Sequence, residues 1–144
     1  NMKKLLAVLL FCFAISIAGT VDSGSTKNKP ADCLASVIWH EARGEPLAGQ
    51  VAVGFVAMNR VFFKGLYPNS LCEVVFQDKQ FTGLTKVWYD QKSMDVARGI
   101  LNGNYKPNLF LATHYHSTAV RPYWSKSMTK LGKIGKHVFY RIDK

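Results

Sequence analysis

Residues 32–46 read DCLASVIWHEARGEP, and they predict a helix that ends in a turn containing glycine and proline. Asp32 is one of the residue types that cap the first turn of a helix. Leu34, Val37 and Ile38 recur at helical spacing, so they should form one apolar face that packs into the core. The helix should stop at the Gly-Glu-Pro end of the stretch, because the residue before a proline avoids the helical region.

Glu41 continues this apolar face and lies near the C-terminal end of the predicted helix. Burial and the negative end of the helix dipole both raise the pKa of a carboxyl group. A carboxylic acid that stays protonated near neutral pH can protonate the leaving oxygen of a sugar, as a glycosidase requires. The spacing fits equally a buried structural carboxylate paired with Arg43 or Arg60. Glu45 lies beyond the helix break, so we expect it at the start of a second helix, where negative charge is favourable.

Three further helices and a small sheet are predicted along the rest of the chain. Ser70 and Glu73 form a capping box, so Glu73 is expected to be a cap and not a catalyst. Ser93 is the expected cap of the last helix. The predicted ranges are 46–61, 70–77 and 94–102 for helices, 80–88 for a short hairpin, and 108–116 and 136–142 for strands. Helices followed by a late sheet element predict a helix-rich α+β domain.

The N-terminal segment has the composition of an export signal. Lys3 and Lys4 precede an apolar run that is shorter than the roughly 20 residues of a membrane-spanning helix. We expect a signal peptide over 1–18, a flexible linker over 19–30 and the catalytic domain over 31–144. The exported protein would touch the membrane only transiently; the alternative is a retained anchor.

The formal net charge of +10 over 144 residues indicates a basic surface that suits an anionic polymer, such as a cell wall. Lysine and arginine are scattered rather than gathered on one helix face, so nucleic-acid binding is not expected. The length is that of one domain, and we expect a monomer. Of the three cysteines, Cys12 falls in the predicted signal. Export would allow Cys33 and Cys72 to form a disulfide, and two buried thiols are the alternative.

The histidines raise the question of a metal site. His40-Glu41 begins like the zinc motif His-Glu-x-x-His, but Gly44 occupies the position of the second histidine. His114 and His116 would share one face of a strand and could hold a metal with a third ligand, which no motif spacing supplies. We therefore expect no metal or cofactor, and a polar pair that lines a cleft. Aromatic side chains on which sugars could stack are Trp39, Trp88, Tyr115, Tyr123 and Trp124.

Four blocks of sequence, taken together and in order, are highly specific for one family. They are 33–35 with 40–46; 49–53 with 59–61; 67–69 with Cys72, Val74, Val75, Gln80 and Phe81; and 112–116 with Pro122, Trp124 and 139–141. On these residues the chain resembles the cell wall hydrolases typified by the spore-cortex-lytic enzyme SleB. The resemblance covers about residues 31–141.

The resemblance implies a lysozyme-like, transglycosylase-type fold that acts on the glycan strands of peptidoglycan. The first glutamate of the Glu-Ala-Arg-Gly-Glu block is regarded as the catalytic acid of the family, and this position is Glu41 here. The expected substrate-binding residues are Gln80, Phe81, His114, Tyr115, His116 and Trp124. Thr82 and Gly83 depart from the family pattern of serine followed by an aromatic residue, which puts one sugar contact in doubt.

The number of available carboxylates favours non-hydrolytic cleavage. Ordinary glycoside hydrolysis uses two carboxylates. Asp32 and Glu73 are expected caps, Glu45 lies past the helix break, and Asp78, Asp90 and Asp95 belong to no recognisable catalytic block. One acid suffices if the C6 hydroxyl of N-acetylmuramic acid attacks its own anomeric carbon and leaves a 1,6-anhydro end, a route the resemblance also supports. Asp78 is the first suspect for a second carboxylate.

Two rival hypotheses belong to other functional classes. One is a zinc-dependent cell-wall amidase or peptidase that uses His114 and His116, which would be sensitive to chelators. The other is a non-catalytic cell-wall-binding module, supported by the basic charge and the aromatic residues.

Overall fold

The computed structural model describes residues 29–77, 80–81 and 84–143. The predicted signal peptide over 1–18, and the linker except for its last two residues, lie outside the described residues. Within the described part, no helix is both long and apolar enough to span a membrane.

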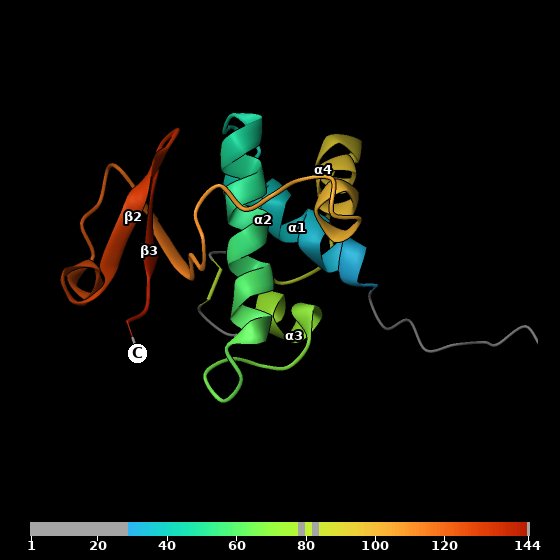
Figure 1. Ribbon diagram of the computed structural model, residues 1–144. Coiled ribbons are helices and arrows are strands. Elements are labelled where there is room, and N and C mark those ends of the chain that lie inside the picture. Colours follow the sequence, from blue (N-terminus) through green and yellow to red (C-terminus); the bar gives the residue numbers. More distant parts are fainter. Residues whose placement is uncertain (1–28, 78–79, 82–83, 144) are drawn as a thin grey trace, which may run out of the picture.

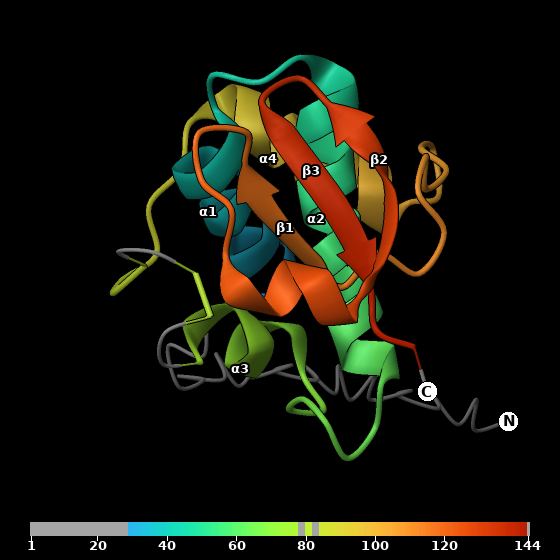
Figure 2. The same ribbon diagram turned by 90° about the vertical axis from the view of Figure 1, so that its left-hand side faces the viewer.

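Helices fill the first part of the described chain and a small sheet fills the last part, so the predicted α+β class is confirmed (Figure 1). The sheet is antiparallel with the order β1-β3-β2, so the last strand lies in the middle (Figure 2). The helices are α1 (Pro30–Ala42), α2 (Leu47–Phe62), α3 (Leu71–Phe76) and α4 (Gln91–Leu101). The strands are β1 (His114–Ser117), β2 (Thr129–Ile134) and β3 (His137–Arg141), and a short 3-10 helix (Tyr123–Ser127) lies between β1 and β2.

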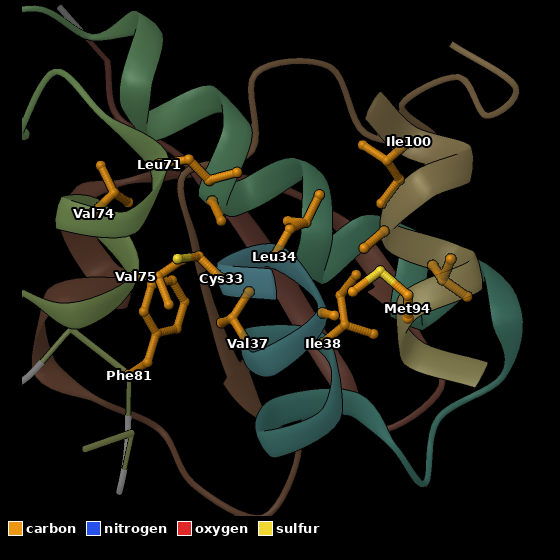
Figure 3. Packing of buried hydrophobic residues seen from close by; sticks show 14 of the residues in the cluster. Cys33, Leu34, Val37, Ile38, Leu71, Val74, Val75, Phe81, Met94 and Ile100 are labelled. Carbon is orange, nitrogen blue, oxygen red and sulfur yellow. The ribbon is translucent and has the colours of Figure 1, made fainter. Parts of the chain in front are cut away.

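Helix α2 lies between the sheet and the other helices (Figure 1). On one side, apolar residues of α1, α3 and α4 form the larger core cluster, into which Leu34 and Ile38 of α1 project (Figure 3). On the other side, a smaller cluster joins Val53 of α2 to Phe139 of β3. Because α2 packs closely against neighbours on both sides, some of its positions have room only for a small residue. A Cβ on Gly54, for example, would lie 2.4 Å from the side chain of Ile100.

Helices α1 and α4 begin three residues earlier than their predicted caps allow. The observed N-caps are Lys29 and Asp90, and the predicted caps Asp32 and Ser93 are each the third residue of their helix. Cap and third residue are hydrogen-bonded in both cases. The Lys29 N–H donates to the Asp32 carboxylate (3.2 Å), and the Ser93 N–H donates to the Asp90 carboxylate (2.8 Å). Both predicted caps are therefore wrong by three residues.

Helix α3 is fixed at its N-terminus and joined covalently to α1. Ser70 is confirmed as the cap of α3, since the Glu73 N–H donates to Ser70 Oγ (3.3 Å), and the Ser70 hydroxyl donates to the Glu73 carboxylate (2.8 Å). The predicted disulfide between Cys33 and Cys72 is present, with their Cα atoms 5.3 Å apart. Figure 3 shows Cys33 beside the apolar residues of α1 and α3.

The predicted strand over 136–142 is confirmed as β3. Of the strand predicted over 108–116, only the last three residues belong to β1, because the chain turns at Leu111, which has a left-handed φ of 61°. The described residues of 80–88 form no strand, so the predicted hairpin is wrong there. That segment lies on α1 instead, where the Trp88 N–H donates to a serine hydroxyl of the helix (3.0 Å).

Strand β2 was not predicted from the sequence. Its Lys130 and Lys133 are exposed, and a bulge between Lys130 and Gly132 interrupts the pairing with β3. A bulge shifts the side chains that follow it to the other face. The sequence of β2 therefore lacks the regular alternation by which half-buried strands are recognised.

Candidate active site

The described residues form a cavity of about 390 Å³ between the C-terminal ends of α1 and α2, the segment around Gln80, and the sheet. This volume lies in the usual range of ligand pockets. The residues that line it come from segments far apart in the sequence: Glu41, Arg60, Gln80, Tyr115, His116, Ser117, Val120, Pro122, Trp124 and His137.

Glu41 lies in the last turn of α1 and presents its carboxylate to this cavity. The Tyr115 hydroxyl of β1 donates a hydrogen bond to Glu41 Oε2 (3.0 Å). Burial raises the pKa of Tyr115 well above its ordinary value, and the negative charge of Glu41 raises it further. Tyr115 therefore stays protonated and acts as a hydrogen-bond donor to the carboxylate throughout the physiological pH range.

Arg60 supplies the cavity with a fixed positive charge. Only 4% of the residue is exposed, and its Nε–H donates to the Thr113 carbonyl (2.8 Å). One of its terminal N–H groups donates to Gln80 Oε1 (3.1 Å), which holds that amide in the cavity wall. Burial lowers the pKa of Arg60, whereas the nearby groups Tyr67, Tyr115 and Glu41 raise it. An arginine stays charged in such a setting, so Arg60 places a fixed positive charge in the cavity that Glu41 also lines.

Arg43, the other candidate partner of Glu41 in the sequence, lies outside the cavity. It is exposed, its guanidinium lies 4.3 Å from the centre of the Trp39 ring, and it donates to the carbonyls of Trp39 and His40 (both 3.3 Å). Arg43 therefore caps the C-terminal end of α1.

Four of the six expected substrate-binding residues line the cavity, namely Gln80, Tyr115, His116 and Trp124. Phe81 does not. It is only 6% exposed, belongs to the larger core cluster, and lies under the guanidinium of Arg60, 4.8 Å from its ring centre. Phe81 therefore supports a cavity residue from behind, because the chain turns inward immediately after Gln80.

His114 also lies outside the lining of the cavity, although it follows the same strand. Its ring is 5.2 Å from that of Trp124, and its Nδ1 lies 3.0 Å from the hydroxyl of Thr113. Burial, aided by the charge of Arg60, lowers the pKa of His114 to about 4. The imidazole is therefore neutral at physiological pH.

His116 faces the cavity, but its two ring nitrogens are both engaged. Nδ1 lies 2.8 Å from the Ser117 carbonyl, and Nε2 lies 2.9 Å from the Tyr140 hydroxyl. Among the residues that the structure describes, no three histidine, cysteine or acidic side chains are close enough together to hold a metal ion. The described residues thus provide no third ligand beside His114 and His116.

His137 is a cavity residue that sequence reasoning missed. It opens β3, is 9% exposed, and its ring centre lies 4.9 Å from that of Tyr115. Burial lowers the pKa of His137, an effect that the charge of Glu45 opposes and that of His116 reinforces. No local pattern in the sequence marks His137 as a cavity residue. Arg60, in contrast, can be recognised from the sequence, because it places a charge on the buried face of an apolar helix.

Glu41 is the only carboxylate among the described residues that line the cavity. The remaining described carboxylates each accept a hydrogen bond elsewhere in the fold: Asp32, Glu45, Glu73, Asp90, Asp95 and Asp143. Glu45 was predicted to lie in the first turn of α2, but that helix begins at Leu47, and the carboxylate binds the β2–β3 turn instead. Asp78, the first suspect for a second catalytic carboxylate, lies outside the described residues.

A helical domain with a small sheet and a single acidic residue in the cavity has the lysozyme-like arrangement. Solved structures confirm this class. The catalytic domain of the germination-specific lytic transglycosylase SleB from Bacillus anthracis is 28% identical and superimposes with a TM-score of 0.70, over 84% of this chain and 100% of that one. The catalytic domain of Bacillus cereus SleB is 27% identical with a TM-score of 0.68, over 83% of this chain and 99% of that one.

The chain belongs to the Cell Wall Hydrolase family, whose sequence profile matches residues 44–140. The spore cortex-lytic enzyme of Bacillus subtilis is 30% identical over 120 residues, which are 81% of this chain and 39% of that protein. That of Oceanobacillus iheyensis is 29% identical over 110 residues, 74% of this chain and 39% of that protein. The chain thus spans less than half the length of these relatives.

Proposed function

We propose that this domain cleaves the glycan strands of peptidoglycan, and that Glu41 is its general acid and base. The observation that carries the proposal is the placement of Glu41 at the end of α1: its carboxylate, the only one among the described residues of the cavity lining, accepts a hydrogen bond from Tyr115. The similar solved structures are catalytic domains, one of them that of a lytic transglycosylase, and this chain covers them over their full length or nearly so.

The proposed reaction cleaves the bond between N-acetylmuramic acid and N-acetylglucosamine without consuming water. Glu41 donates its proton to the glycosidic oxygen as the bond to the anomeric carbon breaks. The C6 hydroxyl of the muramic acid then bonds to that carbon, and its proton passes back to Glu41. The products are a 1,6-anhydro end and a free sugar hydroxyl, and the enzyme returns to its starting protonation state. A second carboxylate, which hydrolysis would require, is not among the described residues of the cavity.

The neighbours of Glu41 fit the half of this cycle in which its carboxylate is charged. Tyr115 donates to the carboxylate and stabilises the charged form that exists after the first proton transfer. Arg60 adds a fixed positive charge to the same cavity and also orients Gln80. Trp124 presents an indole ring beside them, and sugar rings stack on such faces.

The direct test of the assignment is Glu41→Gln, which keeps the size of the side chain and removes its acidic proton. We expect the rate of muropeptide release from purified peptidoglycan to fall roughly 10²–10⁴-fold, the usual contribution of general acid–base catalysis. The matched control is Glu73→Gln, the same substitution on the exposed start of α3. Near-wild-type release by the Glu41 variant would refute the role of this residue.

Export is a further part of the proposal. A domain that acts on cell wall must reach it, and the composition of residues 1–18 is that of a secretory signal. We expect the exported protein, which we propose to be a monomer, to begin near Gly19. Sequencing its N-terminus tests this, and recovery of a chain that still contains Cys12 would favour a retained anchor.

A further inference from the structure

The turn between β2 and β3 is bound to the α1–α2 junction through one carboxylate. Glu45 Oε2 accepts a hydrogen bond from the backbone N–H of Lys136 (2.9 Å). A Cβ on Gly135 would lie 1.9 Å from this oxygen and 3.0 Å from Cδ of Pro46. Gly135 also has a left-handed φ of +55°. A glycine is therefore required at this turn for two separate reasons, the conformation of the backbone and the closeness of the carboxylate.

The backbone that carries this carboxylate is itself held in place. The Glu45 N–H donates to the carbonyl of Ala42 (2.9 Å), the last residue of α1. The Glu45 carbonyl accepts a hydrogen bond from Nε2 of Gln50 (3.0 Å), a side chain that is almost fully buried in α2. The backbone of Glu45 is therefore fixed both to α2 and to the end of α1 that carries Glu41.

On the sheet side of this contact, the backbone of Lys136 leads into the cavity wall. Its carbonyl accepts a hydrogen bond from the N–H of Thr118 (2.8 Å), which follows the last residue of β1. The next residue is His137, whose ring packs against Tyr115, and the Tyr115 hydroxyl donates to Glu41. A continuous series of contacts therefore runs from Glu45 through the turn to the partner of the proposed catalytic acid.

We propose that Glu45 is a positioning residue for the glycan cleavage: it binds the β2–β3 turn to the α1–α2 junction and thereby holds His137 and Tyr115 in place against Glu41. Glu45 is absent from the described lining of the cavity, so it acts through these residues and not on the substrate. The catalytic part of this inference rests on the proposed function.

A double-mutant cycle tests the contact through activity. Glu45→Ala removes the acceptor, and Gly135→Ala places a methyl group against it. Each should lower kcat on the order of 10–100-fold with KM little changed, as expected when catalytic groups are slightly misplaced. In the Glu45→Ala background, Gly135→Ala should cost much less, because the oxygen it strikes is gone. Glu45→Gln should keep most of the activity, since its amide oxygen can still accept the Lys136 N–H.

Gly103→Ala is the matched control. Gly103 has a similarly left-handed φ of +75° but no atom within 4 Å of the position of its Cβ, so it carries the backbone strain without the contact. It should leave kcat nearly unchanged. All variants are compared at a temperature where circular dichroism shows them folded. Wild-type kcat for Glu45→Ala, or fully additive effects in the cycle, would overturn the proposal.

An independent readout does not require the enzyme to be active. The negative charge of Glu45 raises the pKa of His137, whereas burial and His116 lower it. NMR titration should therefore show a lower pKa for His137 in Glu45→Gln than in the wild type, while the Tyr115 resonances change more in Glu45→Ala. An unchanged His137 in both variants refutes the contact. If these shifts appear but no variant, including the wild type, cleaves peptidoglycan, then the proposed function has failed and the structural contact stands.

Discussion

At the scale of single residues, Glu41 is defined by what surrounds its carboxylate. Tyr115 donates to it, and Arg60 provides positive charge in the same cavity. Tyr115→Phe should lower kcat roughly 10–100-fold, because a hydrogen bond to a charged group contributes about 1.5–3 kcal/mol. Rates of muropeptide release measure this. Tyr105→Phe is a suitable control, since Tyr105 packs on α4 and away from the cavity. Equal rates for the two variants would contradict a role for the phenol.

His114 predicts a dependence of stability on pH. Its pKa is about 4 in the folded protein and about 6.5 when unfolded. Between these values the unfolded state binds the extra proton, so the contribution is present above pH 6.5 and is lost as the pH falls toward 4. Because the side chain is partly exposed, we expect this loss to be about 1–2 kcal/mol. The free energy of unfolding, measured with denaturant, should decline less steeply with falling pH in His114→Gln than in the wild type. Parallel declines in the two proteins would refute the lowered pKa of His114.

The candidate site could be predicted where a residue breaks a local pattern. Glu41 stands out because it extends an apolar helical face, and the cavity confirms that it is not simply buried in the core. Arg60 likewise places a charge on an apolar helical face, but from the sequence it was predicted only as a possible partner of Glu41. His137 gives none, since its place in the cavity depends on how β3 pairs with β1, which is a long-range property.

At the scale of secondary-structure elements, helices were predicted better than strands. The spacing of apolar residues in α1 and α2 is a local property, and it located both helices to within a few residues. The caps were misassigned because Asp32 and Ser93 are residue types that cap helices, although each is the third residue of its helix and is hydrogen-bonded to the observed cap. Strand β2 pairs with β3 through a bulge between Lys130 and Gly132, and this bulge interrupts the alternation by which a strand is recognised, so β2 could not be predicted from local pattern.

The disulfide between α1 and α3 should contribute to stability rather than to the reaction. The two cysteines are 39 residues apart, and bridging such a loop typically contributes about 2–4 kcal/mol. Replacing both Cys33 and Cys72 with alanine should lower the free energy of unfolding by this amount while leaving kcat of the folded enzyme close to wild type. Urea denaturation and assays below the transition measure the two effects. Labelling of both thiols in unreduced, denatured protein would contradict the bridge.

At the scale of the whole molecule, the chain is strongly basic, and Glu41 is the only acidic residue among the described residues that line the cavity. A transglycosylase that uses one acid needs no metal ion in its reaction. We therefore expect full activity after dialysis against a chelator. Loss of activity on chelation, followed by recovery on addition of zinc, would favour the amidase hypothesis built on His114 and His116.

The most direct test of the central claim is the mass of the fragments released from purified peptidoglycan in water enriched in ¹⁸O. Transglycosylation through Glu41 alone predicts muropeptides with 1,6-anhydro ends, each lighter by one water than a hydrolysed end, free of ¹⁸O and resistant to borohydride. Fragments with reducing ends that carry ¹⁸O and accept borohydride would contradict it. They would show that water is the nucleophile and that a second carboxylate, with Asp78 the first to replace, completes the site.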